Sequence, residues 1–183
     1  MITEADTCRK YVLPKLYGAG WNDDQISEQK SFTDGRIVVI GSKPRRRPAK
    51  RADYLLRNAR DFMLAVVEAK PSYKLAGDGL QQAKDYAEVL GIKFAYSTNG
   101  HGIVEFDYTS GKERELEIFP SPKELWDRYR IAESLTDEQT ADKLLTPSNT
   151  VVGKGQRYYQ EIAINRVLKA LLQGKKRILL TMA

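Results

Sequence analysis

The chain has 183 residues, which is enough for one sizeable hydrophobic core and part of a second. Its net charge of +6 indicates either a polyanionic partner or a solvated basic surface. A single cysteine, Cys8, and a single histidine, His101, nearly exclude a zinc site of nitrogen and sulfur ligands, so any metal must be held by oxygen. No apolar run approaches about 18 residues and no apolar leader follows Met1, so we expect no membrane span, no signal peptide and a cytoplasmic location.

The N-terminal part predicts a helix and then a hairpin. Thr3 and Asp6 have the spacing of an N-terminal cap, and apolar residues then recur at helical intervals as far as Leu16, so we expect a helix of about four turns. Residues 32–40 alternate around Asp34-Gly35, which predicts a hairpin with residues 36–40 as its second arm. Residues 41–51 interrupt the pattern with two prolines and six basic residues.

The middle of the chain alternates between strands and helices. Residues 62–68 form an almost continuous apolar run, which is typical of a buried central strand. Residues 80–90 predict a helix that Gly91 closes. The remaining expectations are a short strand at 53–57, a turn at 58–61, strands at 94–97 and 103–108, and a helix that begins at Ser121-Pro122.

The composition changes after about residue 135. Residues 136–156 change to mostly polar and small residues, among them Thr, Asp, Glu, Pro, Ser, Asn and Gly, which predicts a linker between a first domain, 1–135, and the start of a second, 157–183. In that second part we expect a helix at 158–172 and a strand at 177–181.

Three side chains carry a candidate chemistry. Glu68 and Lys70 are two residues apart at the end of the apolar strand, so both point to one face of the sheet. If residues 53–57 pair with this strand, the carboxylate of Asp53 approaches Glu68. Two such acids would provide the oxygen ligands that Mg²⁺ prefers. A surface salt bridge among ordinary surface acids is the simpler alternative.

The next helix adds Gln82 and Tyr86. Their spacing of four residues places both side chains on one helix face. Taken alone, the pair is explained by a core tyrosine and a solvated glutamine.

Together these motifs resemble the PD-(D/E)xK nuclease superfamily, with Ala52 in the place of the motif's proline. The resemblance implies that Asp53 and Glu68 bind Mg²⁺, that the Ala69 carbonyl is a further ligand, and that Lys70 orients or helps to deprotonate the attacking water. Gln-x-x-x-Tyr resembles an added motif of the restriction subunits of type I restriction enzymes. Glu4 is a possible contributor to the metal site, or a plain first-turn acid that the helix dipole favours.

The C-terminal part resembles the start of a superfamily 2 helicase. Arg157, Tyr159 and Gln160 match its adenine-binding Q motif, but no phosphate-binding Gly-x-x-x-x-Gly-Lys-Ser/Thr occurs in the sequence. A nuclease followed by such a motor is the layout of the R subunit of type I restriction enzymes, and the resemblance covers essentially the whole chain.

This resemblance implies an α/β fold with a restriction-endonuclease-like core, in which helices flank a mixed sheet, followed by the first helix and strand of a RecA-like domain. It also implies DNA hydrolysis with Mg²⁺, and ATP use only in the full-length subunit. The expected partners are double-stranded DNA and the modification and specificity subunits.

Two questions remain open at this level. The basic residues before Asp53 either grip DNA phosphates or form a solvated loop; they are Arg45, Arg46, Arg47, Lys50 and Arg51. There are two alternatives to a type I subunit. The first is a nuclease-like module that only binds DNA or docks other subunits, and the complete Asp, Glu and Lys set argues against it. The second is an independent nuclease, which would have no use for a Q motif.

Overall fold

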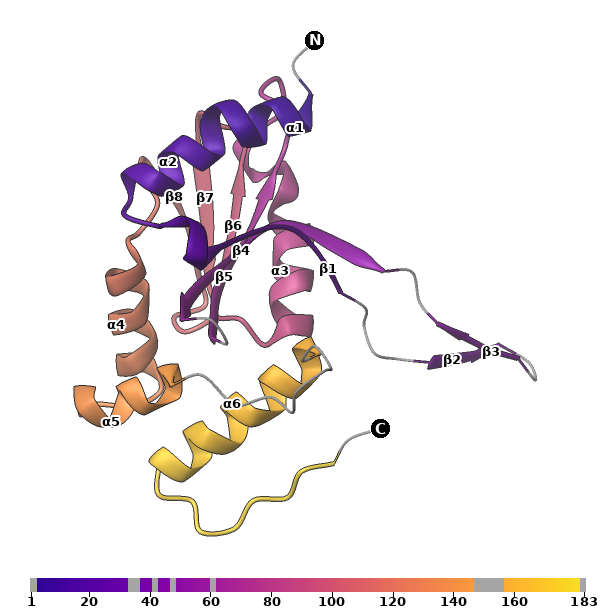
Figure 1. Cartoon of the computed structure of the whole chain (residues 1–183). Coiled ribbons are helices and arrows are strands. Elements are labelled where there is room, and N and C mark those ends of the chain that lie inside the picture. Colours follow the sequence, from indigo (N-terminus) through magenta and orange to yellow (C-terminus); the bar gives the residue numbers. More distant parts are fainter. Residues whose placement is uncertain are drawn as a thin grey trace.

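A mixed six-stranded sheet forms the centre of the protein (Figure 1). The computed structural model describes residues 3–32, 37–40, 43–46, 49–59, 62–146 and 157–181. The strand order is β1-β4-β5-β6-β7-β8, and the pairings are antiparallel except for the parallel pair β5–β6. The strands are β1 (Ile26–Phe32), β4 (Lys50–Ala59), β5 (Phe62–Ala69), β6 (Phe94–Thr98), β7 (Ile103–Asp107) and β8 (Lys112–Leu116).

Helices cover both faces of this sheet (Figure 1). One face packs on the first helix, which runs through α1 (Glu4–Thr7), a π-helical turn η1 (Cys8–Val12) and α2 (Leu13–Gly18), and on α4 (Pro122–Ala132). The opposite face packs on α3 (Leu80–Leu90). This arrangement confirms the predicted α/β fold with a mixed sheet between helices. Short 3₁₀ turns lie at η2 (Asp23–Gln25), η3 (Ala76–Gly79) and η4 (Lys143–Leu145).

The apolar run of β5 is central because it is buried from both sides. Alternate residues face the two cores: Ala65 and Val67 belong to the core under the first helix and α4, whereas Val66 between them belongs to the core under α3. The predicted helix at 80–90 is confirmed, with Gly91 at its end in the left-handed conformation (φ 68°).

The predicted hairpin at residues 32–40 is wrong. The strand β2 (Ile37–Ile40) pairs with β3 (Lys43–Arg46), within the segment expected to be irregular, and β1 pairs with β4 instead. The expected Asp34-Gly35 turn lies outside the described residues. In Figure 1 the β2–β3 ribbon projects away from the main sheet. The strands β1 and β8 were not predicted, because their residues are largely polar and carry little apolar alternation.

The polar segment after residue 135 is partly folded. Its residues form α5 (Glu138–Asp142) and η4, and Ala141 and Leu144 are buried in the core beside α4. The helix α6 (Tyr158–Leu172) has the predicted bounds. The strand expected at 177–181 does not form: these residues pair with no strand among the described ones and are exposed, and a strand is stable only when its backbone hydrogen bonds find partners.

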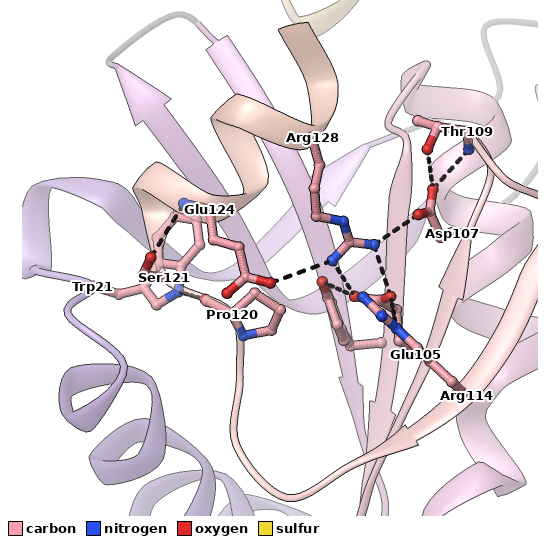
Figure 2. A network of polar contacts seen from close by, with 10 residues as sticks. Trp21, Glu105, Asp107, Thr109, Arg114, Pro120, Ser121, Glu124 and Arg128 are labelled. Carbon is pink, nitrogen blue, oxygen red and sulfur yellow. Dashed lines mark hydrogen bonds and ion pairs between the residues drawn. The ribbon is translucent and has the colours of Figure 1, made fainter. Parts of the chain in front are cut away.

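A buried polar network ties α4 to the sheet (Figure 2). The guanidinium of Arg128 donates to both oxygens of Glu105 at 2.8 and 3.0 Å and to Asp107 at 2.7 Å. Arg114 of β8 also donates to Glu105, at 2.7 Å. Since the side chain of Glu105 is fully buried, these partners are what make its charge tolerable.

Candidate active site

The end of β5 brings the three predicted catalytic residues together. Tyr54 pairs with Val67, so the next residues outward, Asp53 and Glu68, lie opposite each other. Both are buried, at 6% and 2% exposed. The carboxylate of Asp53 is held by the backbone, because the amide of Ala69 donates to its Oδ2 at 2.8 Å. The predicted hairpin geometry for these acids is therefore what the chain adopts.

Lys70 and Gln82 complete a hydrogen-bonded cluster around Glu68. The ammonium of Lys70 lies 3.5 Å from Glu68 Oε1 and donates to Gln82 Oε1 at 3.0 Å. Gln82 in turn donates from Nε2 to Glu68 Oε1 at 2.6 Å and to the hydroxyl of Tyr86 at 2.9 Å. Gln82 is therefore not simply solvated: it connects α3 to the charged end of β5. Tyr86 is buried against the sheet, as the packing alternative expected, and also joins this cluster.

The first helix contributes a third acid. One carboxylate oxygen from each of Glu4, Asp53 and Glu68 lies within 4.8 Å of the others. Thr3 and Asp6 form a reciprocal capping box that starts the helix at Glu4. Farther along, a Cβ on Gly100 (φ 88°) would lie only 2.7 Å from Tyr11 Cβ, so this glycine permits the close approach of the helix to the sheet.

The electrostatics of the cluster favour a bound cation. Burial, and then the negative charge of Asp53, raise the pKa of Glu68 to about 8, against a smaller opposing effect of Lys70. Burial and the same Asp53 charge also raise the pKa of Glu4. Buried carboxylates that repel one another are stabilised as anions by a positive ion between them.

An unused acceptor supports the same conclusion. Glu68 Oε2 is buried and finds no hydrogen-bond partner among the described residues, a state that costs free energy unless a ligand occupies it. Three carboxylates with a free buried oxygen fit a small divalent cation such as Mg²⁺, which takes oxygen ligands. Ala69, whose carbonyl was expected to be a further ligand, lies buried between Glu68 and Lys70.

Two of the predicted DNA-binding residues, Lys50 and Arg51, belong to β4, the strand that carries Asp53. The Lys50 ammonium lies 5.8 Å from the ring centroid of Tyr86, and Arg51 is exposed. Arg45 and Arg46 belong to β3, and Arg47 lies outside the described residues.

The Q-motif residues form the start of α6. Gln160 caps the helix by accepting from the backbone amide of Arg157 at 3.0 Å, and Arg157 also donates to the hydroxyl of Tyr159 at 3.3 Å. All three are exposed.

Two residues of the site were missed from the sequence. Gln29 of β1 donates to Asp53 Oδ1 at 2.9 Å, and no motif signals it. Gly79 precedes α3, and a Cβ there would lie 2.8 Å from Ser97 Oγ and 2.9 Å from Lys70 Cε. A glycine just before a helix was the only available signal for Gly79.

Comparisons with known proteins point to one group of enzymes. No family model matches the chain. The whole chain is similar to the type I restriction enzyme EcoAI endonuclease subunit of Escherichia coli, with 37% identity over 189 aligned positions that make up 23% of that subunit. A solved fragment of a candidate HsdR subunit of a type I restriction enzyme from Vibrio vulnificus YJ016 is 56% identical. It superposes with a TM-score of 0.85 over 98% of this chain and 34% of that one.

Both relatives are longer than this chain. It spans about a quarter of the E. coli subunit and a third of the V. vulnificus chain, by the coverages of 23% and 34%. Among the described residues, no helix has the length and apolar character needed to cross a bilayer.

Proposed function

Since this chain is a homologue of the HsdR endonuclease subunits of type I restriction enzymes and has a restriction-endonuclease-like fold, we propose that it is the nuclease part of such a subunit. It hydrolyses DNA phosphodiester bonds with Mg²⁺ as a type I site-specific deoxyribonuclease. The observation that carries this proposal is the convergence of Glu4, Asp53 and Glu68 within 4.8 Å beside the ammonium of Lys70.

The residues present divide the work of hydrolysis. Asp53 and Glu68 would hold Mg²⁺, with Glu4 and the Ala69 carbonyl as further candidates, and the bound ion would lower the pKa of the attacking water and offset the charge on the phosphate. Lys70 lies beside this group of acids, where its ammonium can orient the water and attract the phosphate. The water oxygen bonds to phosphorus, the bond to the leaving sugar oxygen breaks, and a proton passes from the water to the leaving group or solvent.

The surroundings suit a polyanion. The chain has a net charge of +6, and the half-buried Lys50 and the exposed Arg51 lie three and two residues before Asp53 in β4. We propose that these residues and Arg45, Arg46 and Arg47 contact the phosphates of double-stranded DNA, a contact that salt would weaken. Sequence recognition would belong to the specificity subunit and assembly would also involve the modification subunit. ATP, bound near Arg157, Tyr159 and Gln160, would serve only the longer protein in the cytoplasm.

Nicking of supercoiled plasmid tests the proposal. With Mg²⁺ the chain, or the longer subunit in its assembled complex, should convert supercoiled into nicked and linear DNA, and EDTA should stop the reaction. Glu68→Ala and Asp53→Ala should abolish cutting, whereas Glu113→Ala, an exposed acid on β8, should not. In the complex both site variants should still translocate with ATP. DNA binding without any cutting by the complex would favour a non-catalytic docking module instead.

A further inference from the structure

A strained residue lies inside β1. Among the described residues other than glycine, positive φ angles occur at Gln29 (50°) and Ser134 (57°). Ser134 follows the end of α4, where a left-handed residue commonly terminates a helix. Gln29 has no such reason, because it lies in the middle of a strand. Backbone strain of this kind persists where the surrounding structure requires it, often at functional sites.

Gln29 lies directly across from a predicted metal ligand. The pairs Glu28–Tyr54 and Lys30–Ala52 have the same register, so Gln29 stands opposite Asp53. Its side chain donates from Nε2 to Asp53 Oδ1 at 2.9 Å, and the amide of Ala69 donates to Oδ2 at 2.8 Å. The carboxylate of Asp53 is therefore held from both neighbouring strands, with one hydrogen bond to each oxygen.

A neutral amide suits this position. Each carboxylate oxygen has two lone pairs, so one hydrogen bond to each leaves Asp53 able to bind a cation. A lysine or arginine donor here would add positive charge that repels the cation, and an acid could not donate when ionised. We infer that Gln29 is a positioning residue, which orients Asp53 for the divalent metal; this inference rests on the proposed function.

A structural explanation for the strained backbone makes a different prediction. If the positive φ only bends β1, then glycine, which adopts this conformation without strain, would serve at least as well as glutamine. The two explanations therefore disagree about Gln29→Gly. In this variant the backbone can still adopt the positive φ, and the side chain that donates to Asp53 is removed.

Calorimetric titration with Mn²⁺, paired with thermal unfolding, tests the inference on the purified chain. We expect Gln29→Gly to melt at or above the wild-type temperature, because strain is relieved, yet to bind Mn²⁺ about 10-fold more weakly, as is common when a hydrogen-bond partner of a metal ligand is removed. Gln29→Ala should lose similar affinity and melt below Gln29→Gly. The control Ser31→Gly, an exposed position farther along the same strand, should keep wild-type affinity.

The comparison with Asp53→Ala separates two failures. If Asp53→Ala loses Mn²⁺ binding while Gln29→Gly binds as the wild type does, the positioning role is overturned and the metal site stands. If the wild type binds no Mn²⁺, or Asp53→Ala binds it normally, the proposed metal site itself is wrong. Weaker binding by Gln29→Gly with an unchanged melting temperature supports the inference.

Discussion

Lys70 reaches the cluster of acids because it follows Glu68 by two residues at the end of β5. Its ammonium lies 3.5 Å from Glu68 and 3.0 Å from Gln82, and the side chain is 18% exposed. A lysine held in this way can serve either a structural salt bridge or the reaction. The two roles differ in what happens to the metal when the ammonium is removed.

For Lys70→Ala we expect loss of DNA cleavage with Mn²⁺ affinity unchanged or higher, because the ammonium repels the cation and is not a ligand. A purely structural salt bridge at this partly exposed position would instead cost about 0–1 kcal/mol of stability and leave cleavage intact. Calorimetry and a cleavage assay on the same variant distinguish them. Normal cleavage would reject the catalytic role, and loss of metal binding would mean that Lys70 only holds Glu68 in place.

At the scale of elements, the junction between η3 and α3 packs closely against side chains at the end of β5 and in β6. Gly79 is the last residue before α3, and its amide donates to Ser97 Oγ at 3.0 Å. Its φ of −95° is open to any residue, so its requirement for glycine is one of space alone. A Cβ at this position would come too close to Ser97 Oγ, at 2.8 Å, and to Lys70 Cε, at 2.9 Å.

We expect Gly79→Ala to reduce cleavage strongly, because the methyl group must displace Lys70 or Ser97, at a cost of about 1–3 kcal/mol in stability. Gly77→Ala is the matched control: its Cβ would lie 3.8 Å from Val104 Cγ2, an ordinary contact. Cleavage rates and urea unfolding of both variants make the comparison. Equal cleavage by the two variants would show that Gly79 does not set the position of Lys70.

At the scale of the whole molecule, the polar network of Figure 2 holds α4 on the sheet and shares no residue with the candidate active site. Glu105 has no exposed side-chain surface and depends on Arg128, Arg114 and Tyr96 for its hydrogen bonds. Burial alone would raise the pKa of Glu105, but the bonds from Arg128, Tyr96 and Arg114 outweigh it and lower the pKa below 4.5.

Arg128→Met should therefore destabilise the fold by about 3 kcal/mol, since it leaves part of a buried negative charge unpaired. Lys123→Met, which removes an exposed pair with Asp127 on the same helix, should cost far less, because solvent screens an ion pair at the surface. Urea unfolding at neutral pH measures both. Mn²⁺ affinity should stay unchanged in either variant, and a loss of metal binding in Arg128→Met would contradict the separation of the two sites.

The same network predicts a response to acid. The pKa of Asp107 is also lowered, because hydrogen bonds from Thr109 and Arg128 outweigh its burial. Folded-state pKa values below the ordinary 4.5 and 3.8 mean that Glu105 and Asp107 add stability above those values, and that this stability is lost as the pH falls through the lower folded values. Arg128→Met should lose less stability than the wild type between neutral pH and about pH 3. If the stability of the wild type and of Arg128→Met fell by the same amount over this pH range, the prediction would be refuted.

The helix α6 contacts the sheet through the salt bridge between Glu161 and Arg57 of β4 at 3.3 Å, and the end of α4 through Lys169 and Glu133 at 2.9 Å. Its Q-motif residues lie exposed at its start. Without a phosphate-binding loop in the sequence, we expect this chain neither to bind ATP tightly nor to hydrolyse it, because no loop of backbone amides cradles the phosphates. Micromolar binding by calorimetry would show that another part of the chain holds the nucleotide.

The sequence alone predicted the features that depend on local periodicity and spacing. The helices at 80–90 and 158–172, the buried strand β5 and the shared face of Glu68 and Lys70 all follow from repeats of about four or two residues along the chain. The nuclease resemblance came from the same short motifs. Its residue roles stay predictions until the metal and cleavage assays are done.

Only the tertiary structure determined the features that depend on contacts between segments far apart in the sequence. Tertiary pairing and packing determine the partner of β1, the folding of residues 138–145 and the edge strand β8. These segments are largely polar, so their sequences carry no apolar periodicity that predicts such contacts. Gln29 and Gly79 are further examples, since one acquires its role from the strand opposite and the other from side chains that fill its space. Local pattern records the preference of each segment, whereas contacts between segments far apart in sequence are set by the free energy of the whole fold.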